Sequence, residues 1–492
     1  MFFSIDIPGD FLTGSFTGDL VLFLIPINLV LVFAMMFWER SDPQSTLLWM
    51  MVMLFIPALG FILYLFIGQT FYSKYAFRSK AYDDLRFKKA MKGQKIQLKM
   101  DQDDLEMEHP GSSNFVNTMA SVCHGYTDDN EVELFTDGRL YFKALFEDIR
   151  NAKKTINFEF YIIRNDEIGE GLVNLLTRKQ EEGVEVRIMC DAFGFGKGPK
   201  KAMKRFVDAG GDFTLFHSRA VCLLSPRKNN RNHRKIMVVD GAIGWTGGHN
   251  IGNEYFGKGP LGHWRDASVR IVGGAVNSLQ LRFLTDWRYA TRQDLVLEER
   301  FYNNPFGNGK EVVQVISGGP DVIEKSPIHA QYLMLFTRCR KTLYIQTPYL
   351  VPDEASLAVL KLAAVSGVDV RIMIPDKPDH IFVYWANLHY ANQLMEAGVR
   401  VYHYKNGFVH AKTIVADSYY CSVGSSNLDE RSMKLNFETN AMIYSHELGG
   451  ELTDTFMGDL EQCDEYTVEK YKNKNLRESL KVSVCRLASS LL

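Results

Sequence analysis

Two long apolar runs without charged residues stand near the N-terminus, at residues 20–38 and 47–67. As helices, both are long enough to cross the hydrocarbon core of a bilayer, which is about 30 Å thick. Only residues 39–46 separate them, which leaves room for a short loop. The pattern therefore predicts a transmembrane helical hairpin in residues 1–70.

Residues 71–110 are predicted to form a basic, membrane-proximal linker. Residues 71–100 hold nine Lys or Arg and two Asp, whereas the loop at 39–46 holds one Arg, one Glu and one Asp. Because basic residues are enriched on the cytoplasmic side of a span, the part that follows the hairpin is predicted to be cytoplasmic. A basic cluster of this kind also attracts anionic lipid headgroups. We therefore expect a cell-membrane protein with two spans and an anionic bilayer as a partner.

Beyond residue 110 the pattern changes to apolar strands separated by helical stretches, and it occurs twice. Strands are expected at 154–162 and 183–189, and again at 341–351 and 367–373. Strands that alternate with helices indicate parallel βαβ units. The repeat predicts an α/β fold with two similar domains related by a pseudo-twofold axis, at residues 111–305 and 306–492, the second ending in a helical segment.

Composition and charge narrow the class of protein. The chain is 46% hydrophobic and 23% charged, so it folds around a large core. The 56 basic and 58 acidic residues leave a net charge of -2, which argues against a general nucleic-acid binder. The seven cysteines are scattered without a C-x-x-C pair or a zinc spacing, and we interpret them as core thiols.

Each domain contains the pattern H-x-K-x4-D-x6-G-[GS]-x-N. The first copy provides His233, Lys235, Asp240 and Asn250; the second provides His410, Lys412, Asp417, Ser425 and Asn427. Alternation along a strand puts the His and Lys of each copy on one face. Because the spacing is identical in two copies of a duplicated unit, the two motifs are expected to serve one site.

A paired motif of this form resembles the signature of the phospholipase D superfamily. The hairpin and the segments at 264–266, 347–353 and 436–438 further resemble bacterial cardiolipin synthases of the two-helix membrane type. The resemblance implies transfer of a phosphatidyl group from one phosphatidylglycerol to another, giving cardiolipin and glycerol. The first motif departs from the second, with Gly248 where the second has Ser425, so any hydroxyl contact to phosphate is expected from the second half only.

The resemblance also implies a role for each motif residue. His233 attacks phosphorus to form a phosphatidyl-histidine, and His410 protonates the leaving glycerol and then deprotonates the second substrate. Phosphate oxygens would be held by Lys235, Lys412, Asn250, Ser425 and Asn427.

Four acids complete the expected site. Asp240 and Asp417 belong to the signature, but each follows its histidine by seven residues across a short strand, so we expect structural pairing. The resemblance implies that acids farther along the chain orient the imidazoles. Glu438, 28 residues after His410, suits that role, and Asp266 is its counterpart after a longer loop.

Other functions remain open at the level of the sequence. A hydrolytic phospholipase D would use the same residues with water as the acceptor. A membrane-tethered phosphodiesterase or nuclease would need a basic groove. No metal site or other cofactor is expected, since exchange of one phosphodiester for another needs no nucleotide and the chain lacks a G-x4-G-K-[ST] loop. Nothing in the sequence indicates an oligomeric state.

Overall fold

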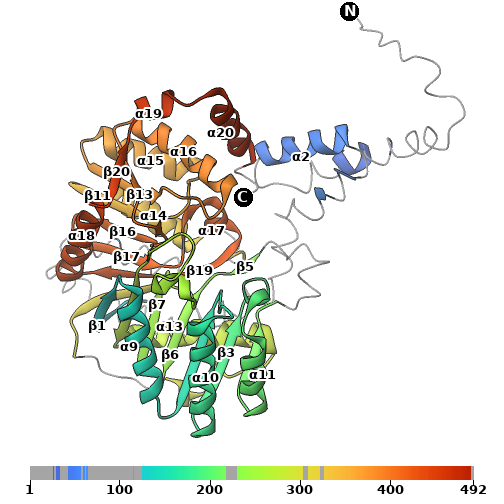
Figure 1. Ribbon diagram of the computed structural model, residues 1–492, viewed down its shortest axis with the longest axis vertical. Helices are drawn as coiled ribbons and strands as arrows, with labels where there is room; N and C mark the ends of the chain where they lie inside the picture. Colours follow the sequence, from blue (N-terminus) through green and yellow to red (C-terminus); the bar gives the residue numbers. More distant parts are fainter. Residues whose placement is uncertain are drawn as a thin grey trace, which may run out of the picture. The chain divides into compact units, whose positions relative to one another are not determined.

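The structure is a computed structural model that describes residues 26, 29–33, 43–56, 59–60, 63–64, 115, 125–217, 230–302, 308–321 and 326–488 (Figure 1). The chain divides into two compact units. One contains residues 1–78 and 220–229, and the other contains residues 79–219 and 230–492.

The N-terminal unit contains helix α2 (Pro43–Phe55), which begins before the predicted span at 47–67. Trp49 and Met53 of α2 are buried against Val32 and Tyr64, and the rings of Trp49 and Tyr64 meet edge to face at 5.6 Å. Within the described ranges, no helix is long and apolar enough to cross a membrane. Much of the predicted spans, and all of the predicted linker at 71–110, lies outside the described residues.

The larger unit consists of two halves with the same order of main elements. The first half contains β1 (Thr127–Phe135), α9 (Gly138–Asn151), β2 (Thr155–Phe160), α10 (Glu167–Glu181), β3 (Glu185–Cys190), η2 (Gly194–Lys197), α11 (Lys200–Asp208), β4 (Asp212–Leu215), β5 (Arg231–Asn232), β6 (Lys235–Val239), β7 (Ile243–Gly247), η4 (Asn253–Phe256), β8 (Trp264–Arg265), β9 (Ser268–Val272), α13 (Ala275–Thr291) and η5 (Glu299–Phe301).

The second half repeats this order and continues beyond it. It contains β10 (Glu311–Gly318), α14 (Pro327–Arg338), β11 (Thr342–Gln346), β12 (Leu350–Val351), α15 (Glu354–Val365), β13 (Asp369–Pro375), α16 (Ile381–Met395), β14 (Arg400–Tyr404), β15 (Phe408–Val409), β16 (Thr413–Ala416), β17 (Tyr420–Gly424), β18 (Leu428–Asp429), α17 (Glu430–Lys434), β19 (Asn436–Tyr444), α18 (His446–Leu460), β20 (Cys463–Tyr466), α19 (Val468–Lys472) and α20 (Leu476–Ala488). The C-terminal helix α20 packs against α16.

The strands of both halves join into one mixed sheet. Strands β2, β3 and β4 are parallel, as are β11, β13 and β14, which confirms the predicted βαβ units. The motif strands β6 and β16 run antiparallel to β2 and β11. At the centre of the sheet, β1 pairs with β10, so the two halves share a continuous surface of strands. The molecule thus has the predicted α/β architecture.

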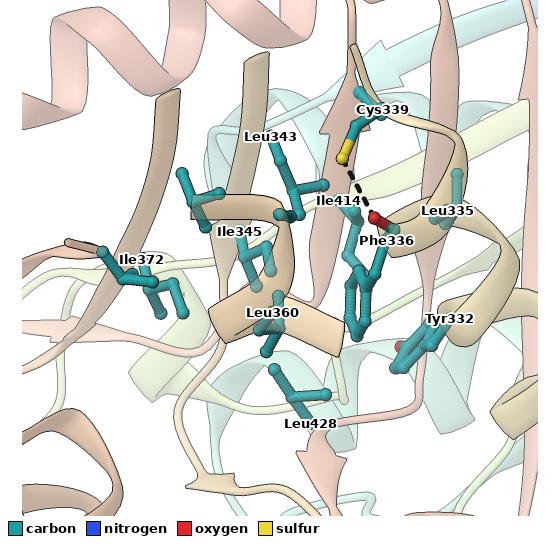
Figure 2. Packing of buried hydrophobic residues seen from close by; sticks show 14 of the residues in the cluster. Tyr332, Leu335, Phe336, Cys339, Leu343, Ile345, Leu360, Ile372, Ile414 and Leu428 are labelled. Atoms are coloured by element: carbon teal, nitrogen blue, oxygen red, sulfur yellow. Dashed lines mark hydrogen bonds between the residues drawn. The ribbon is translucent and has the colours of Figure 1, made fainter. Parts of the chain in front are cut away.

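Each half has its own hydrophobic core between its strands and helices. In the second half, Leu343, Ile345 and Ile372 from β11 and β13 meet Leu360 of α15 and Phe336 of α14 (Figure 2). Because every residue of β2 is buried, the strand is covered on both faces, as in a parallel sheet between helix layers. The five cysteines in the described part of the chain are unpaired thiols; four are buried, in line with the interpretation as core residues, and Cys463 is half-buried.

Candidate active site

Two short parallel pairings bring the motif histidines together with the opposite half. Strand β5, directly before His233, pairs with the beginning of β19, and the N–H of His233 donates to the carbonyl of Phe437 at 2.9 Å. In the same way β15, directly before His410, pairs with β8, and the N–H of His410 donates to the carbonyl of Arg265 at 2.7 Å. The backbone of each histidine is therefore held by the other half.

Both histidines are hydrogen-bonded to a buried acid. Nδ1 of His233 lies 2.9 Å from Oε2 of Glu438, and Nδ1 of His410 lies 2.5 Å from Oδ2 of Asp266. The two carboxylates are fully buried. Glu438 and Asp266 were expected from the sequence, but their partners are exchanged: each acid pairs with the histidine of the other half, because β19 starts beside β5 and β8 lies beside β15.

The two motif lysines are buried beside the histidines. Nζ of Lys235 donates to the carbonyl of His233 at 2.7 Å and lies 5.6 Å from the centre of the Tyr161 ring. Nζ of Lys412 donates to the main-chain carbonyl of His410 and lies 2.9 Å from Nδ1 of the His410 ring. Burial lowers the pKa of Lys235 to about 7 and the pKa of Lys412 to about 8.

The electrostatic interactions join both motifs in one site. Besides burial, the charge of Lys412 lowers the pKa of Lys235, and the charge of Lys235 lowers the pKa of His410. Burial lowers the pKa of His233 to about 4, against the opposing attraction of Glu438. A neutral ring that donates Nδ1–H to a carboxylate keeps its lone pair on Nε2. Such a ring can act as a nucleophile or as a base.

The signature aspartates lie at the far end of the motif strands. Asp240 accepts hydrogen bonds from the backbone N–H groups of Lys153, Lys154 and Thr155 at 2.7 to 2.9 Å. Asp417 accepts the equivalent three bonds from residues 340–342 at 2.7 to 2.9 Å. These carboxylates bind the turn that precedes β2 or β11, so they secure the motif strand rather than the reacting groups.

The residues expected to hold phosphate are engaged within the protein to different degrees. Nδ2 of Asn250 donates to the hydroxyl of Tyr255 at 2.7 Å, and its Oδ1 accepts from the N–H of Ile162 at 3.2 Å. Asn427 is buried, and its Nδ2 donates to Oδ2 of Asp429 over the longer distance of 3.4 Å. Because this N–H bond is the weaker of the two, the Nδ2 of Asn427 is the amide donor more available for a phosphate oxygen.

Ser425 does not present its hydroxyl to a ligand as expected. Its Oγ donates to Oε2 of Glu438 at 2.5 Å and accepts from the N–H of Thr439 at 2.9 Å. Gly248 is the matching position in the first half, and a Cβ there would lie 2.0 Å from Oδ1 of Asp266. Ser425 thus holds Glu438, whereas any side chain at position 248 would have to displace the carboxylate of Asp266.

Aromatic residues close to the histidines were not predicted as site residues. The ring of Tyr161 meets that of His233 edge to face at 5.0 Å, and Tyr255 meets His410 at 5.5 Å. Trp264 also lies beside His410, with ring centres 5.2 Å apart. Tyr255 could not be identified from its place in the chain, because it belongs to η4 and reaches the second motif only through the pairing of β8 with β15.

The paired motifs and the duplicated sheet define a class of phospholipase D-like proteins. A family model described as "Cardiolipin synthase, PLD-like domain" matches residues 145–262 and 332–460, and one described as "Phospholipase_D-nuclease N-terminal" matches residues 27–69. The crystal structure of phosphatidylserine synthase from Haemophilus influenzae Rd KW20 has the same fold, with a TM-score of 0.55 and 16% identity over 73% of this chain and 95% of that chain.

Relatives among characterised proteins identify the family within this class. A cardiolipin synthase of Staphylococcus aureus (strain Mu50) is 40% identical over 98% of this chain and 97% of its own length. A cardiolipin synthase of Clostridium perfringens (strain 13) is 40% identical over 92% of this chain and 95% of its own length. The chain belongs to the cardiolipin synthase family, and it is a phosphatidyltransferase.

Proposed function

We propose that the chain transfers a phosphatidyl group from one phosphatidylglycerol to the headgroup hydroxyl of a second, and so makes cardiolipin and glycerol. The observation that carries this proposal is the pair of histidines, each bonded to an acid of the opposite half and both close to two buried lysines. Two rings of this kind supply a nucleophile and a separate proton carrier in one site.

In the first step, Nε2 of His233 attacks phosphorus, and the bond from phosphorus to the oxygen of the headgroup glycerol breaks. His410 gives its Nε2 proton to that oxygen, and Asp266 stabilises the charged ring before transfer. The negative charge of the bound phosphodiester offsets the positive charges of Lys235 and Lys412. It therefore raises the pKa of His410 and favours the protonated ring in the complex. The products of this step are free glycerol and a phosphatidyl group on His233.

In the second step, His410 takes the proton from a hydroxyl of the second phosphatidylglycerol. The resulting oxygen attacks phosphorus, the bond from phosphorus to Nε2 of His233 breaks, and cardiolipin leaves. His233 is again neutral and His410 again carries the proton, so the cycle closes without a co-reactant. Lys235, Lys412 and Asn427 are the groups we assign to the non-bridging oxygens, where positive charge stabilises the transition state.

Vesicles of phosphatidylglycerol provide the test of this activity. We expect cardiolipin and glycerol in equal amounts, with the same rate in EDTA, because the lysines supply the positive charge. Among the described residues, no group of three or more His, Cys, Asp or Glu side chains could hold a metal ion. Phosphatidic acid as the main product would instead favour the hydrolytic phospholipase D, and loss of turnover in EDTA that one divalent cation restores would contradict the charge assignment.

The pH dependence of kcat/KM follows from the pKa shifts in the free protein. As pH falls through the pKa of His233, about 4, the ring gains a proton and loses its nucleophilic lone pair. As pH rises, His410 loses the proton that it donates to the leaving glycerol, and burial together with the charge of Lys412 holds the pKa of this ring well below its usual value. We therefore expect a bell-shaped profile, measured with mixed micelles, whose alkaline limb moves upward in Lys412→Gln, because without the lysine charge His410 keeps its proton to higher pH. An alkaline limb that does not move in Lys412→Gln would exclude His410 as its source.

We further propose that the N-terminal unit crosses the cell membrane twice and that the catalytic halves are cytoplasmic. The apolar runs at 20–38 and 47–67 are long enough for spans, and the match at 27–69 covers most of both. The packing of Trp49 and Met53 against Val32 supports a hairpin. The nine-to-two excess of basic over acidic residues at 71–100 sets the orientation.

Protease treatment of right-side-out vesicles tests this orientation. Residues 100–492 are expected to be protected from added protease and to become sensitive after the vesicles are opened. A single cysteine placed in the loop at 39–46 of a chain without other cysteines should react with an impermeant maleimide from outside. Digestion of the catalytic halves in sealed vesicles would overturn the topology.

A further inference from the structure

A buried arginine lies behind the acid that orients His233. Nη1 of Arg234 is 2.5 Å from Oδ2 of Asp286 on α13, and both side chains are almost fully buried. Its Nε donates to the main-chain carbonyl of Glu438 at 3.3 Å, and its Nη2 donates to the carbonyl of Gly318 at 3.0 Å. One guanidinium therefore connects the backbone of the acid to a helix of the first half.

A second buried arginine lies behind the acid that orients His410. Nε of Arg265 is 2.9 Å from Oδ2 of Asp459 on α18, and Nη1 donates to the main-chain carbonyl of Asp266 at 2.6 Å. The same Nη1 also donates to the carbonyl of Thr136 at 2.9 Å. The carbonyl of Arg265 itself accepts the N–H groups of His410 and Ala411 at 2.7 and 3.0 Å. This residue thus contacts both members of the pair through its side chain and backbone.

The two arginines are equivalent in space but not in sequence. Arg234 directly follows its histidine, where the second motif has Ala411. Arg265 directly precedes its acid, where the other acid is preceded by Phe437. The guanidinium of Arg234 lies 5.2 Å from the centre of the Phe437 ring, so the apolar residue at the alternative position packs against the arginine. Each histidine–acid pair has one arginine. In the first pair the arginine is the chain neighbour of the histidine, and in the second pair it is the chain neighbour of the acid.

We propose that Arg234 and Arg265 are the positioning residues of the His233–Glu438 and His410–Asp266 pairs. Each fixes the main-chain carbonyl of its acid against an aspartate on the helix that follows β9 or β19. The carboxylate therefore stays within hydrogen-bond distance of Nδ1 while the charge on the imidazole changes. Replacement of the partners of metal-ligating side chains typically lowers activity by about 10- to 100-fold, and we expect an effect of the same size from these arginines. The assignment of each arginine to a reaction step rests on the proposed function.

Lysine is the substitution that tests positioning without leaving the buried aspartate unpaired. Arg265→Lys and Arg234→Lys keep the positive charge for Asp459 and Asp286, but a single ammonium lacks the planar fork that reaches two acceptors. Arg270→Lys is the matched control. Arg270 donates to Asp148 at 2.8 and 3.1 Å from β9 and contacts neither histidine nor either orienting acid. Thermal unfolding of each purified full-length protein reports any general loss of stability.

The substrates are phosphatidylglycerol and phosphatidyl-p-nitrophenol, whose leaving group needs no general acid. Arg265→Lys is expected to lower kcat on phosphatidylglycerol by about 10- to 100-fold with little change in KM, while the burst of p-nitrophenol keeps its rate. Arg234→Lys is expected to slow the burst as well. Arg270→Lys should match the unsubstituted protein within about twofold in both assays.

Equal kcat losses in all three variants, or wild-type kcat in Arg234→Lys and Arg265→Lys, would overturn the positioning role. If the two arginine effects were exchanged, positioning would be supported and the assignment of His233 as nucleophile would be wrong. If the unsubstituted protein gave steady release instead of a burst, the burst would be compared in the His410→Ala background, where the intermediate persists, and its absence there would count against the two-step chemistry alone. The loss of kcat relative to Arg270→Lys would then still decide for or against positioning.

Discussion

His410→Ala is expected to release one equivalent of p-nitrophenol from phosphatidyl-p-nitrophenol and then to stall. The nucleophile His233 survives in this variant, and an activated leaving group needs no proton from His410. The incoming hydroxyl has no base, so the phosphatidyl-enzyme persists. His233→Ala should give no burst with any leaving group. Turnover of phosphatidylglycerol should fall by about 10⁴-fold or more in both variants, as for groups that act as a unit.

Stopped-flow absorbance measures the amplitude of the p-nitrophenol burst, which is compared with the enzyme concentration. The burst amplitude should equal the concentration of folded His410→Ala protein, and it should be absent in the double variant His233→Ala/His410→Ala. A burst in His233→Ala with none in His410→Ala would exchange the roles of the two rings. Slow, steady release without a burst in both variants would indicate direct attack by water.

Glu438→Gln is expected to abolish the burst, whereas Asp266→Asn is expected to preserve it. Glu438 is bonded to His233 and Asp266 to His410, so each substitution disables one ring. His233 is needed to form the intermediate with any leaving group, whereas with p-nitrophenol as leaving group His410 is needed only for the second step. An amide can stabilise the wrong tautomer and does not stabilise the imidazolium; in a serine protease, the corresponding change lowers kcat by about 10⁴-fold. We expect a loss of about 10³- to 10⁴-fold on phosphatidylglycerol for both variants.

Asp240→Asn is the control for this pair of acids. Its carboxylate accepts three backbone N–H groups at the far end of β6, so the variant should be less stable yet keep a full burst per folded molecule. If Asp266→Asn abolished the burst and Glu438→Gln preserved it, while His410→Ala still gave the burst and His233→Ala did not, each acid would serve the histidine of its own half, and the crossed arrangement would be contradicted.

The sequence was sufficient for the parts of the site that depend on local spacing. Alternation along β6 and β16 places His and Lys together, and the duplication indicates that both copies serve one site. The crossed partners of Glu438 and Asp266 could not be predicted, because the pairings of β5 with β19 and of β15 with β8 connect segments that are far apart along the chain. Spacing within one half carries no information about such contacts.

Ser425 shows a second limit of motif-based prediction. A hydroxyl beside a glycine in a phosphate-handling motif suggests a ligand contact. The hydroxyl of Ser425 instead donates to Glu438, whose side chain is one methylene longer than that of Asp266. At Gly248, the side chain of Asp266 occupies the space that a Cβ would take. The residue at this motif position therefore differs between the two halves together with the acid beside it.

The arginines behind the acids were also missed, although one lies inside the motif. Arg234 occupies the variable position of H-x-K, where a sequence pattern assigns no role, and Arg265 stands in the segment 264–266, which indicates the family but no role for this residue. Their common feature is the bond from a guanidinium to the carbonyl of an orienting acid. That feature depends on the packing of α13 against β6 and of α18 against β16. No pattern in the neighbouring sequence predicts it.

Mapping the covalent intermediate tests the central claim most directly. The full-length protein would be mixed with phosphatidylglycerol labelled in the phosphatidyl group, quenched with base within one turnover, and digested for mass spectrometry of the labelled peptide. We predict the label on the peptide that contains His233, and its loss when unlabelled phosphatidylglycerol is added before the quench. A label on the His410 peptide would contradict the assignment of the nucleophile, and no label at any time in a protein that makes cardiolipin would contradict the two-step mechanism.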